Sequence, residues 1–394
     1  MNAIALSCGV EPLPPQIRTN NQAKKPAGGG LLCAVVVRRR QAEVFMEVKQ
    51  NTLYLTVNGA YVSRDHLNLK VEIERETRLS VPIHHLESVC VFGQSSLSPH
   101  ALQLCWEHGV AVNYFSESGW LLGRWEAVPN TSVTLRRAQY RAADDQWRSA
   151  ALARQFVAGK LQNARQSLLR SARDSAHDAE AAQLRACAED LAQLLARLQR
   201  LAASDQSLTV NQIRGYEGQA ASLYFAAFNL HLRQQREDFT FTTRNKRPAR
   251  DAVNCLLSFL YALVRHDCMA ALTSTGLDPF VGYLHTERPA RPALALDLME
   301  EFRTLLADRL AITLINRRQI TATDFVTRDG GAVEFTPAGR KAVITAWQTR
   351  KQETVRHPLL DQDFRIGQLM LAQARILARH LRGDLPEYLP CVLK

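Results

Sequence analysis

The sequence lacks the cysteine spacing of a disulfide framework or of a structural zinc site, because none of its eight cysteines forms a C-x-x-C pair. Most of them lie in apolar runs, which indicates reduced, buried thiols. No internal repeat is present, and no stretch is predicted to be long enough to cross a membrane. The apolar run Leu31–Val37 is short, and basic residues follow it, which is the wrong charge order for a secretory signal. We therefore expect a cytoplasmic protein with no membrane partner.

Acidic residues are in the minority, with 38 Asp and Glu against 49 Lys and Arg, so the net charge is +11. A soluble protein with this excess tends to meet an anionic partner, of which nucleic acid is the commonest. A solvated basic surface without a partner is the alternative. The length of 394 residues favours two domains, and an apolar content of 46% is enough to build their cores.

Residues 1–47 differ from the rest of the chain. They carry four prolines and three consecutive glycines, without sustained periodicity. This composition predicts a poorly ordered extension. Met46 lies just before the first strong strand, so we also consider a translation start near Met46. An intact mass equal to that of the full chain would exclude that start.

Residues 48–128 are predicted to form a small β-rich domain. Leu53, Leu55 and Val57 alternate with polar or aromatic residues, and several short alternating runs follow. The dipeptide Asn58-Gly59 predicts a hairpin turn. One short helix is expected to begin at Ser98-Pro99 and to stop at Gly109.

Residues 129–394 are predicted to form a larger all-α domain, which makes the fold class α+β. Apolar residues recur at helical spacing, and a small hairpin around Asp329-Gly330-Gly331 interrupts them. The expected helices lie near 132–171, 177–203, 209–236, 252–274, 292–314, 337–353 and 363–382.

Glu217 lies on the apolar stripe of one predicted helix, four residues after Ile213 and seven before Tyr224. A carboxylate that points inward must be paired, protonated or bound to a metal. Gly215 and Gly218 flank it. Because each glycine costs roughly 1 kcal/mol relative to alanine inside a helix, we expect close approach of another backbone or of a substrate. A buried ion pair between Glu217 and an arginine is the alternative, and this helix alone favours it.

A second group of chemically active residues surrounds Pro292, which suits the first turn of a helix. Asp297 and Glu300 are three residues apart and share a face, with Glu301 beside them and His285 in the preceding loop. Carboxylates with one imidazole suit Mg²⁺ or Mn²⁺, and the absence of cysteine argues against structural zinc. The alternative is an acidic helix surface with His285 as a loop capping residue.

A basic loop lies between these two groups and opens a predicted helix at Asp251. A basic loop at a helix start is a ready phosphate site, and Arg288 adds charge next to His285. A solvated loop is the alternative. The cationic residues of the loop are Arg244, Lys246, Arg247 and Arg250.

Three motifs now stand in order along the chain. The first is Gly215-Tyr216-Glu217-Gly218, and the second joins Arg247-Pro248 to residues 251–261. The third runs from Gly276-Leu277-Asp278-Pro279 through Leu284-His285 to residues 295–303. Together they closely resemble the CRISPR-associated integrase/endonuclease family of the spacer-acquisition complex, and the third motif is most similar to the type I-C branch. The resemblance extends from about Asn51 to the late helices.

The resemblance implies a β-rich dimerisation domain and a helical catalytic domain with one divalent metal site, for Mg²⁺ or Mn²⁺, in each subunit. It assigns Glu217, His285 and Glu300 as metal ligands and Asp297 as a supporting carboxylate. The implied partners are a second copy of the chain, a small ferredoxin-like adaptation protein, and double-stranded DNA as incoming spacer and as CRISPR repeat. The expected DNA contacts are Arg244, Lys246, Arg247, Arg250, Arg288 and Tyr216.

The implied activity is metal-dependent transesterification, in which a 3′-hydroxyl of the incoming DNA attacks a phosphodiester at the edge of a repeat. With water as the nucleophile, the same site would cut DNA. Two other functions stay open. One is a metal-dependent nuclease of DNA repair or RNA processing that uses the same residues. The other is a non-catalytic scaffold that bridges DNA through its basic charge.

Overall fold

The computed structural model describes residues 51–55, 57–116, 121–125, 133–203, 208–245 and 248–393. The chain separates by its internal contacts into Met1–Glu47 and Val48–Lys394. The predictions for residues 1–47, including a start near Met46, fall outside the described residues. The predicted domain boundary at 128/129 also falls outside them and stays a prediction.

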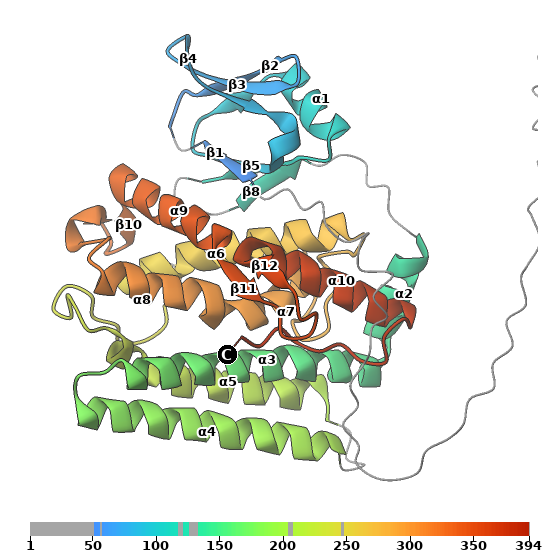
Figure 1. Cartoon of the computed structure of the whole chain (residues 1–394), viewed down its shortest axis with the longest axis vertical. Coiled ribbons are helices and arrows are strands. Elements are labelled where there is room, and N and C mark those ends of the chain that lie inside the picture. Colours follow the sequence, from blue (N-terminus) through green and yellow to red (C-terminus); the bar gives the residue numbers. More distant parts are fainter. Residues whose placement is uncertain are drawn as a thin grey trace, which may run out of the picture. The chain divides into compact units, whose positions relative to one another are not determined.

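The first described region is rich in strands, and the rest is mostly helical (Figure 1). Ser98 begins the α-helix of the first region, α1, because its side chain accepts a hydrogen bond from the Ala101 N–H at 3.1 Å. Gly109, with a φ of +67°, follows the end of that helix, as predicted. The elements are β1 Asn51–Leu55, β2 Tyr61–Asp65, β3 Asn68–Ile73, β4 Glu76–Pro82, η2 Ile83–His85, β5 Leu86–Phe92, β6 Ser96–Leu97, α1 Pro99–Glu107, β7 Ala111–Phe115 and β8 Leu121–Trp125.

These strands form two four-stranded sheets, in the orders β1-β5-β7-β8 and β4-β3-β2-β6. The predicted hairpin at Asn58-Gly59 is wrong, because β1 and β2 belong to different sheets and β1 pairs with β5 in parallel. The turn bonds to a distant loop instead. The Gly59 N–H donates to the Gln94 carbonyl at 2.7 Å, and the Asn58 side chain accepts from the Gln94 N–H at 2.9 Å.

Strand β5 is buried on both faces, because its side chains point alternately into two hydrophobic cores. Val89 and Val91 pack in the core of the β-rich region, whereas Cys90 and Phe92 belong to the core of the helical region. Phe92 lies 6.0 Å, centroid to centroid, from Phe259 of α6 (Ala252–Ser274). The β-rich region and the helices therefore share a packed boundary.

The helical region is not entirely α-helical, because it contains two short hairpins besides its helices. The hairpin around Asp329 was predicted, and the hairpin of β11 and β12 was not. The elements are α2 Val133–Asp144, α3 Gln146–Arg173, α4 Asp178–Ala203, α5 Val210–Ala226, η3 Phe228–His231, α6 Ala252–Ser274, α7 Ala293–Phe302, η4 Arg303–Asp308, α8 Arg309–Asn316, η5 Ala322–Asp324, β9 Phe325–Thr327, β10 Val333–Phe335, α9 Pro337–Gln352, β11 Thr354–Arg356, β12 Asp363–Arg365, η6 Ile366–Gln368 and α10 Leu369–Arg382.

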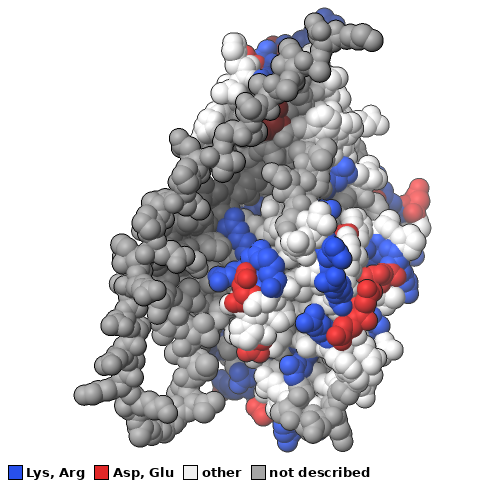
Figure 2. Space-filling model, turned by 90° about the vertical axis from the view of Figure 1, so that its right-hand side faces the viewer, with Lys and Arg blue, Asp and Glu red and all other residues white. Residues whose placement is uncertain are grey.

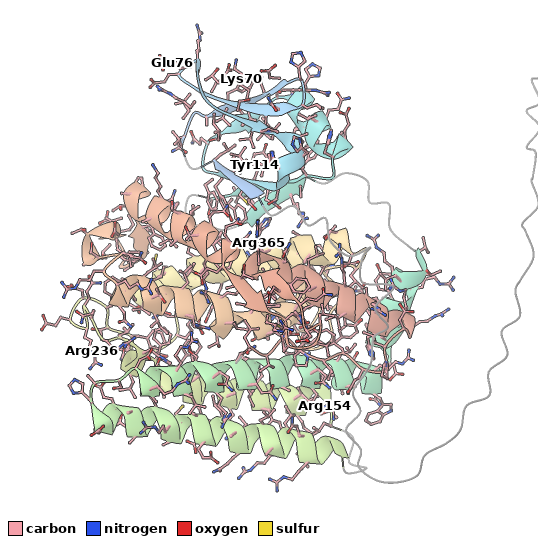
Figure 3. The ribbon with its side chains drawn as sticks, in the orientation of Figure 1. Lys70, Glu76, Tyr114, Arg154, Arg236 and Arg365 are labelled. Atoms are coloured by element: carbon pink, nitrogen blue, oxygen red, sulfur yellow. The ribbon has the colours of Figure 1, made fainter. Side chains whose placement is uncertain are left out.

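Four predicted helices are shorter or more divided than expected, and the one predicted at 292–314 is divided into α7, η4 and α8. Asp145 divides the first, because its carboxylate accepts from the N–H groups of Trp147 and Arg148 and so begins a new helix, α3. The third ends at Ala226. There the chain turns into η3 and a loop that carries Arg236 (Figure 3). Arg236 ties this loop to α4 by two hydrogen bonds to Glu180, at 2.7 and 2.8 Å. The last begins as strand β12 and becomes α-helical only at Leu369.

Helix α6 corrects the expectation that no stretch could cross a membrane. By length and composition it is apolar enough to do so, but 67% of its most apolar window is buried inside the protein. A helix that packs on all sides is apolar all round, so this is the pattern of a core helix.

On the face that Figure 2 displays, Lys and Arg side chains form several groups with Asp and Glu among them.

Candidate active site

Glu217 is positioned by α5, which a reciprocal capping pair begins. Thr209 accepts from the Gln212 N–H, and the Gln212 side chain accepts from the Thr209 N–H. Ile213 and Tyr224 on the same stripe are buried, as predicted. The Glu217 carboxylate forms an ion pair with Lys160 of α3, while 27% of its side chain stays exposed. The alternative of an ion pair between Glu217 and an arginine is therefore wrong, because the partner is a lysine.

His285 is held in place by Asp297, which is fully buried in α7. One carboxylate oxygen accepts from the backbone N–H groups of Tyr283 and Leu284, at 2.6 and 2.9 Å. The other accepts from the His285 backbone N–H at 2.9 Å and lies 2.8 Å from its ring Nδ1. A carboxylate on Nδ1 fixes the tautomer in which the opposite nitrogen, Nε2, is free to bind a cation.

Gly282 makes this arrangement sterically possible. A Cβ at this position would lie 2.7 Å from the backbone of Ala293 and 2.7 Å from an Asp297 carboxylate oxygen. Only glycine lets the loop approach α7 this closely. The glycine that opens the segment Gly282–His285 thus lets three consecutive N–H groups reach one carboxylate.

Glu300 is also buried, with 1% of its side chain exposed. Its carboxylate lies 2.8 Å from Lys160 Nζ, 3.0 Å from Arg303 Nη2 and 3.7 Å from His285 Nε2. Burial alone would raise the pKa of Glu300, but Arg303, Lys160 and His285 outweigh it and lower the pKa to about 2. The side chain is therefore a carboxylate at any physiological pH.

The structure brings together Glu217, His285 and Glu300, which come from three separate segments. Among the described residues, no three His, Cys, Asp or Glu side chains are close enough in this conformation to surround one ion. The ammonium of Lys160 contacts both carboxylates instead.

The residues present fit a divalent cation by the chemistry of their donors. Two carboxylates and one neutral imidazole suit Mg²⁺ or Mn²⁺, and the carboxylates already converge on a single positive charge. His285 Nε2 faces Glu300, and its ring is oriented by Asp297, as is usual for a metal-binding histidine. Binding would require Lys160 Nζ to move away from one of the two carboxylates.

Glu301 is turned toward the C-terminal segment and away from this group. Its carboxylate accepts from Tyr388, from the Cys391 N–H at 2.8 Å and from Gln373 at 3.0 Å. Burial raises the pKa of Glu301 to about 8. The alternative of an acidic helix surface is wrong, because Asp297, Glu300 and Glu301 are all buried.

The predicted phosphate-contacting residues are in different surroundings. Arg244 is committed to the protein, because it donates to Asn254 at 2.6 Å and to Ser258 at 3.0 Å. Arg250 is exposed and donates to the Gly330 carbonyl of the β9–β10 turn. Arg288 is exposed in the loop after His285, and Tyr216 is half-buried beside Glu217. Lys246 and Arg247 lie outside the described residues.

Three residues of this site were missed by sequence reasoning. Lys160 lies on the buried stripe of α3, where a lysine among apolar residues was a usable signal. Arg303 begins the π-helical turn η4 that follows α7. Asp308 ends that turn and accepts from the Tyr261 hydroxyl at 2.7 Å. The guanidinium groups of Arg244 and Arg303 both lie over the Tyr261 ring, at 5.3 and 5.2 Å.

Asp308 gives a pH prediction. Burial raises its pKa from 3.8 to about 6, against the opposing effects of Tyr261 and Arg303. Because the pKa of Asp308 is higher in the folded state than in the unfolded state, protonation of Asp308 stabilises the fold. This contribution to the free energy of unfolding is complete below pH 3.8 and is lost as pH rises through 6. In Asp308→Asn, the difference in unfolding free energy from wild type should change by about 3 kcal/mol between roughly pH 4 and pH 7. Parallel curves from denaturant titrations would contradict the prediction.

Gly215 and Gly218 do not serve close packing within the described part of the protein. A Cβ at either position would meet nothing within 4 Å. Both residues are exposed on α5, next to the Glu217 carboxylate. The sequence predicted close approach of another backbone or of a substrate at these glycines. Approach of another backbone is not found among the described residues.

Comparison with known proteins places the chain. A family model described as CRISPR associated protein Cas1 matches residues 53–349. The chain belongs to this family. The match includes Lys160, Glu217, His285, Asp297 and Glu300.

Relatives of the family match most of the chain. The CRISPR-associated endonuclease Cas1 1 of Moorella thermoacetica is 45% identical over 345 residues, which are 88% of this chain and 99% of the relative. That of Chlorobaculum tepidum is 44% identical over 347 residues, 88% of this chain and 99% of the relative.

Solved structures share the fold. A CAS1 protein from Thermotoga maritima superposes with a TM-score of 0.72 at 22% identity, covering 87% of this chain and 100% of that one. A chain of a Cas6-RT-Cas1–Cas2 complex has a TM-score of 0.73 at 25% identity, covering 89% of this chain and 37% of that one. Both have the mixed α/β architecture described above.

Proposed function

We propose that this chain is a divalent-metal-dependent DNA endonuclease and integrase that inserts spacers into a CRISPR array by transesterification. The observation that carries the proposal is the convergence of Glu217, His285 and Glu300 from three segments, with Asp297 orienting the histidine. Membership of the Cas1 family, whose relatives are named endonucleases, supports the chemistry.

Glu217 and Glu300 supply the negative charge of a cation site, and His285 supplies a neutral nitrogen donor. The low pKa of Glu300 keeps its charge available. Lys160 and Arg303, which now neutralise these carboxylates, are placed to hold the phosphate oxygens of a strand that enters the site. When bound there, Mg²⁺ or Mn²⁺ would stabilise charge on the scissile phosphate and acidify the attacking hydroxyl.

The wider assignments belong to the same proposal. We propose that the substrate is double-stranded DNA, both as incoming spacer and as CRISPR repeat, and that Arg250 and Arg288 contact its phosphates. A small ferredoxin-like adaptation protein is the proposed partner, supported by the solved complex that contains Cas2. The cytoplasm is the proposed location, and the wording of residues 295–303 supports the type I-C branch.

A homodimer through the β-rich region is also proposed. Trp106 and Trp125 stack 5.6 Å apart with 42% and 44% exposed, and Leu122 of the sheet-edge strand β8 is 68% exposed. An exposed apolar edge strand is a typical pairing surface. Light scattering on the purified protein tests this, and a monomer mass at all concentrations would exclude it.

The test of the activity is a strand-joining assay with labelled DNA that carries 3′-hydroxyl ends and a supercoiled plasmid that contains a CRISPR repeat. Wild-type protein should form covalently joined half-site products with Mn²⁺ or Mg²⁺ and none with a chelator. Cleaved ends without joined products would instead indicate the nuclease of repair or RNA processing. If the protein forms neither joined nor cleaved products with metal, the non-catalytic DNA-bridging scaffold is the function that remains.

Gly218→Ala separates stability from substrate approach. The added methyl enters open space on a helix, so we expect the unfolding free energy to rise by about 0.5–1 kcal/mol. If DNA lies on this face, the same methyl should lower the joining rate several-fold. Thermal unfolding and the joining assay measure the two effects separately. A more stable variant with unchanged joining would show that no substrate contacts this glycine.

A further inference from the structure

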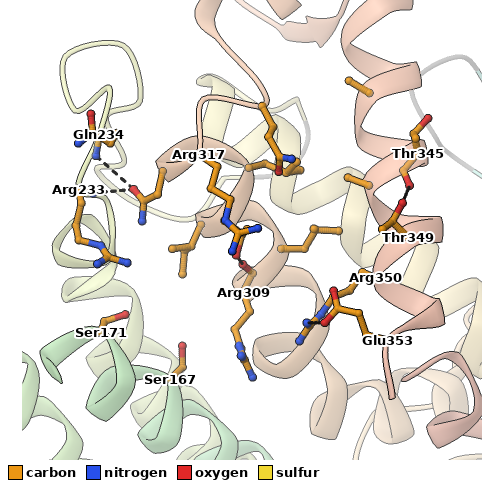
Figure 4. Close-up of a pocket in the computed structure, with 18 of the residues that line it drawn as sticks. Ser167, Ser171, Arg233, Gln234, Arg309, Arg317, Thr345, Thr349, Arg350 and Glu353 are labelled. Carbon is orange, nitrogen blue, oxygen red and sulfur yellow. Dashed lines mark hydrogen bonds and ion pairs between the residues drawn. The ribbon is translucent and has the colours of Figure 1, made fainter. Parts of the chain in front are cut away.

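A large open groove of about 1180 Å³ lies between α3, α8, α9 and the loop at Arg233 (Figure 4). Its cationic lining residues are Arg170, Arg233, Arg309, Arg317, Lys341 and Arg350, and its acidic ones are Asp174 and Glu353. Both acids are already paired, Asp174 with Arg233 at 3.7 Å and Glu353 with Arg350. Within the described residues, this leaves four lining cations without an acidic partner.

The unpaired cations follow from helical spacing. Arg309 begins α8 and Arg317 directly follows its last residue, with Thr313 midway between them, and all three line the groove. On α9, Lys341, Thr345 and Thr349 repeat every four residues and line it as well. Each helix thus turns a stripe of cations and hydroxyls toward the same space. Guanidinium, ammonium and hydroxyl groups are the side chains that contact phosphate oxygens.

Two elements connect this groove to the candidate active site. On α3, Ser167 and Ser171 line the groove and share a helix face with Lys160, which contacts Glu217 and Glu300. The distance along α3 from Lys160 to Arg170 is about 15 Å, at 1.5 Å per residue. The turn η4 likewise joins Arg303, beside Glu300, to Arg309 in the groove.

The lining also indicates how a ligand would be recognised. Among the described residues, no aromatic side chain lines the groove, so bases have no ring to stack on. Its apolar lining consists of small or aliphatic side chains such as Ala338, Ala342 and Leu310. Contacts from such a groove would go to the sugar-phosphate backbone and would be independent of sequence.

From these observations we infer that the groove is a second DNA site, which holds the phosphodiester backbone of a strand on its way to or from the candidate active site. The inference rests on the proposed function. It adds a DNA-binding site that is independent of sequence and lies about 15 Å along α3 from Lys160 of the candidate active site. It is distinct from Arg244, Arg250 and Arg288, none of which lines the groove.

The experiment measures DNA affinity without chemistry. A fluorescein-labelled duplex with single-stranded 3′ ends is titrated with the full-length protein in chelator-containing buffer, over a series of salt concentrations. The groove variant is Arg317→Gln with Lys341→Gln. The control is Arg185→Gln with Arg197→Gln, which removes the same charge from exposed positions of α4 that do not line the groove. Glutamine keeps helix propensity close to that of the residues replaced.

The groove variant should bind about tenfold more weakly than wild type. Its slope of log affinity against log salt should fall by about 2, because two fewer phosphates are neutralised by the protein. The control should keep the wild-type slope. Equal affinity and slope for both variants would overturn the inference, as would a loss confined to single-stranded RNA of the same sequence. Equal thermal unfolding of both variants shows that they fold.

Failure of this inference is distinguishable from failure of the proposed function. If both variants bind alike while wild-type protein still joins strands, only the groove assignment is wrong. If wild-type protein joins no strands with either metal, the proposed function is wrong whatever the binding data show. Arg170→Gln with Arg309→Gln, nearer to the site, repeats the binding test with independent residues and should give the same weakening.

Discussion

Replacing Glu217 by glutamine is expected to lower the strand-joining rate on the order of a thousandfold, while DNA affinity changes less than about twofold. The amide keeps the shape of the side chain but removes the charge that a divalent cation needs. Glu300 still pairs with Lys160 in this variant, so the protein should stay folded. Joined products measured over time, beside anisotropy binding in chelator, separate chemistry from affinity.

Glu189→Gln is the matched control, because Glu189 is exposed on α4, away from the site. It undergoes the same chemical change and should join strands at the wild-type rate. Wild-type joining by the Glu217 variant, with metal-free reactions blank, would remove Glu217 from the metal site. Loss of DNA binding in parallel with joining would instead make Glu217 a binding residue.

Asp297→Asn is expected to have the largest combined effect on stability and activity. Asp297 accepts hydrogen bonds on both oxygens, from three backbone N–H groups and the His285 ring. Asparagine turns an NH₂ group toward one of these pairs of donors. Because each buried group left unsatisfied costs roughly 1–3 kcal/mol, we expect a loss of about 3 kcal/mol in unfolding free energy. Denaturant unfolding measures it.

The same change should reduce joining by about 10- to 100-fold, because His285 loses the carboxylate that orients its ring. Joining should partly recover at higher metal concentration, which a purely structural loss would not produce. Asp190→Asn is the control, since Asp190 is exposed on α4 and its change should stay within about 0.5 kcal/mol. Full joining by Asp297→Asn would show that the ring needs no such partner.

Local signals explain what the sequence could predict. Ser98 and Gly109 begin and end a helix through their own side chain or backbone, so this element was found. Glu217 was singled out because one carboxylate on an apolar stripe is costly. These features depend on a few neighbouring residues, which a single sequence displays directly.

The errors share a different cause, which is long-range contact. Asn58-Gly59 has the composition of a hairpin turn, but Gln94 and the parallel partner β5 decide its strand pairing. Lys160 is far in sequence from both carboxylates that it contacts, so no motif included it. The charge of the groove is equally hidden, because its cations are spread over α3, α8 and α9.

The π-helical turn η4, Arg303–Asp308, determines which way the following helix faces. Such a turn contains about one residue more than an α-helical turn, and each residue of an α-helix rotates the chain by about 100°. If these six residues were wound as an ordinary α-helix instead, α8 would be rotated by about a quarter turn or more. Arg303 would still face Glu300, whereas Arg309 and Arg317 would turn out of the groove. The angular offset between the site and the groove thus depends on the π-helical winding of six residues.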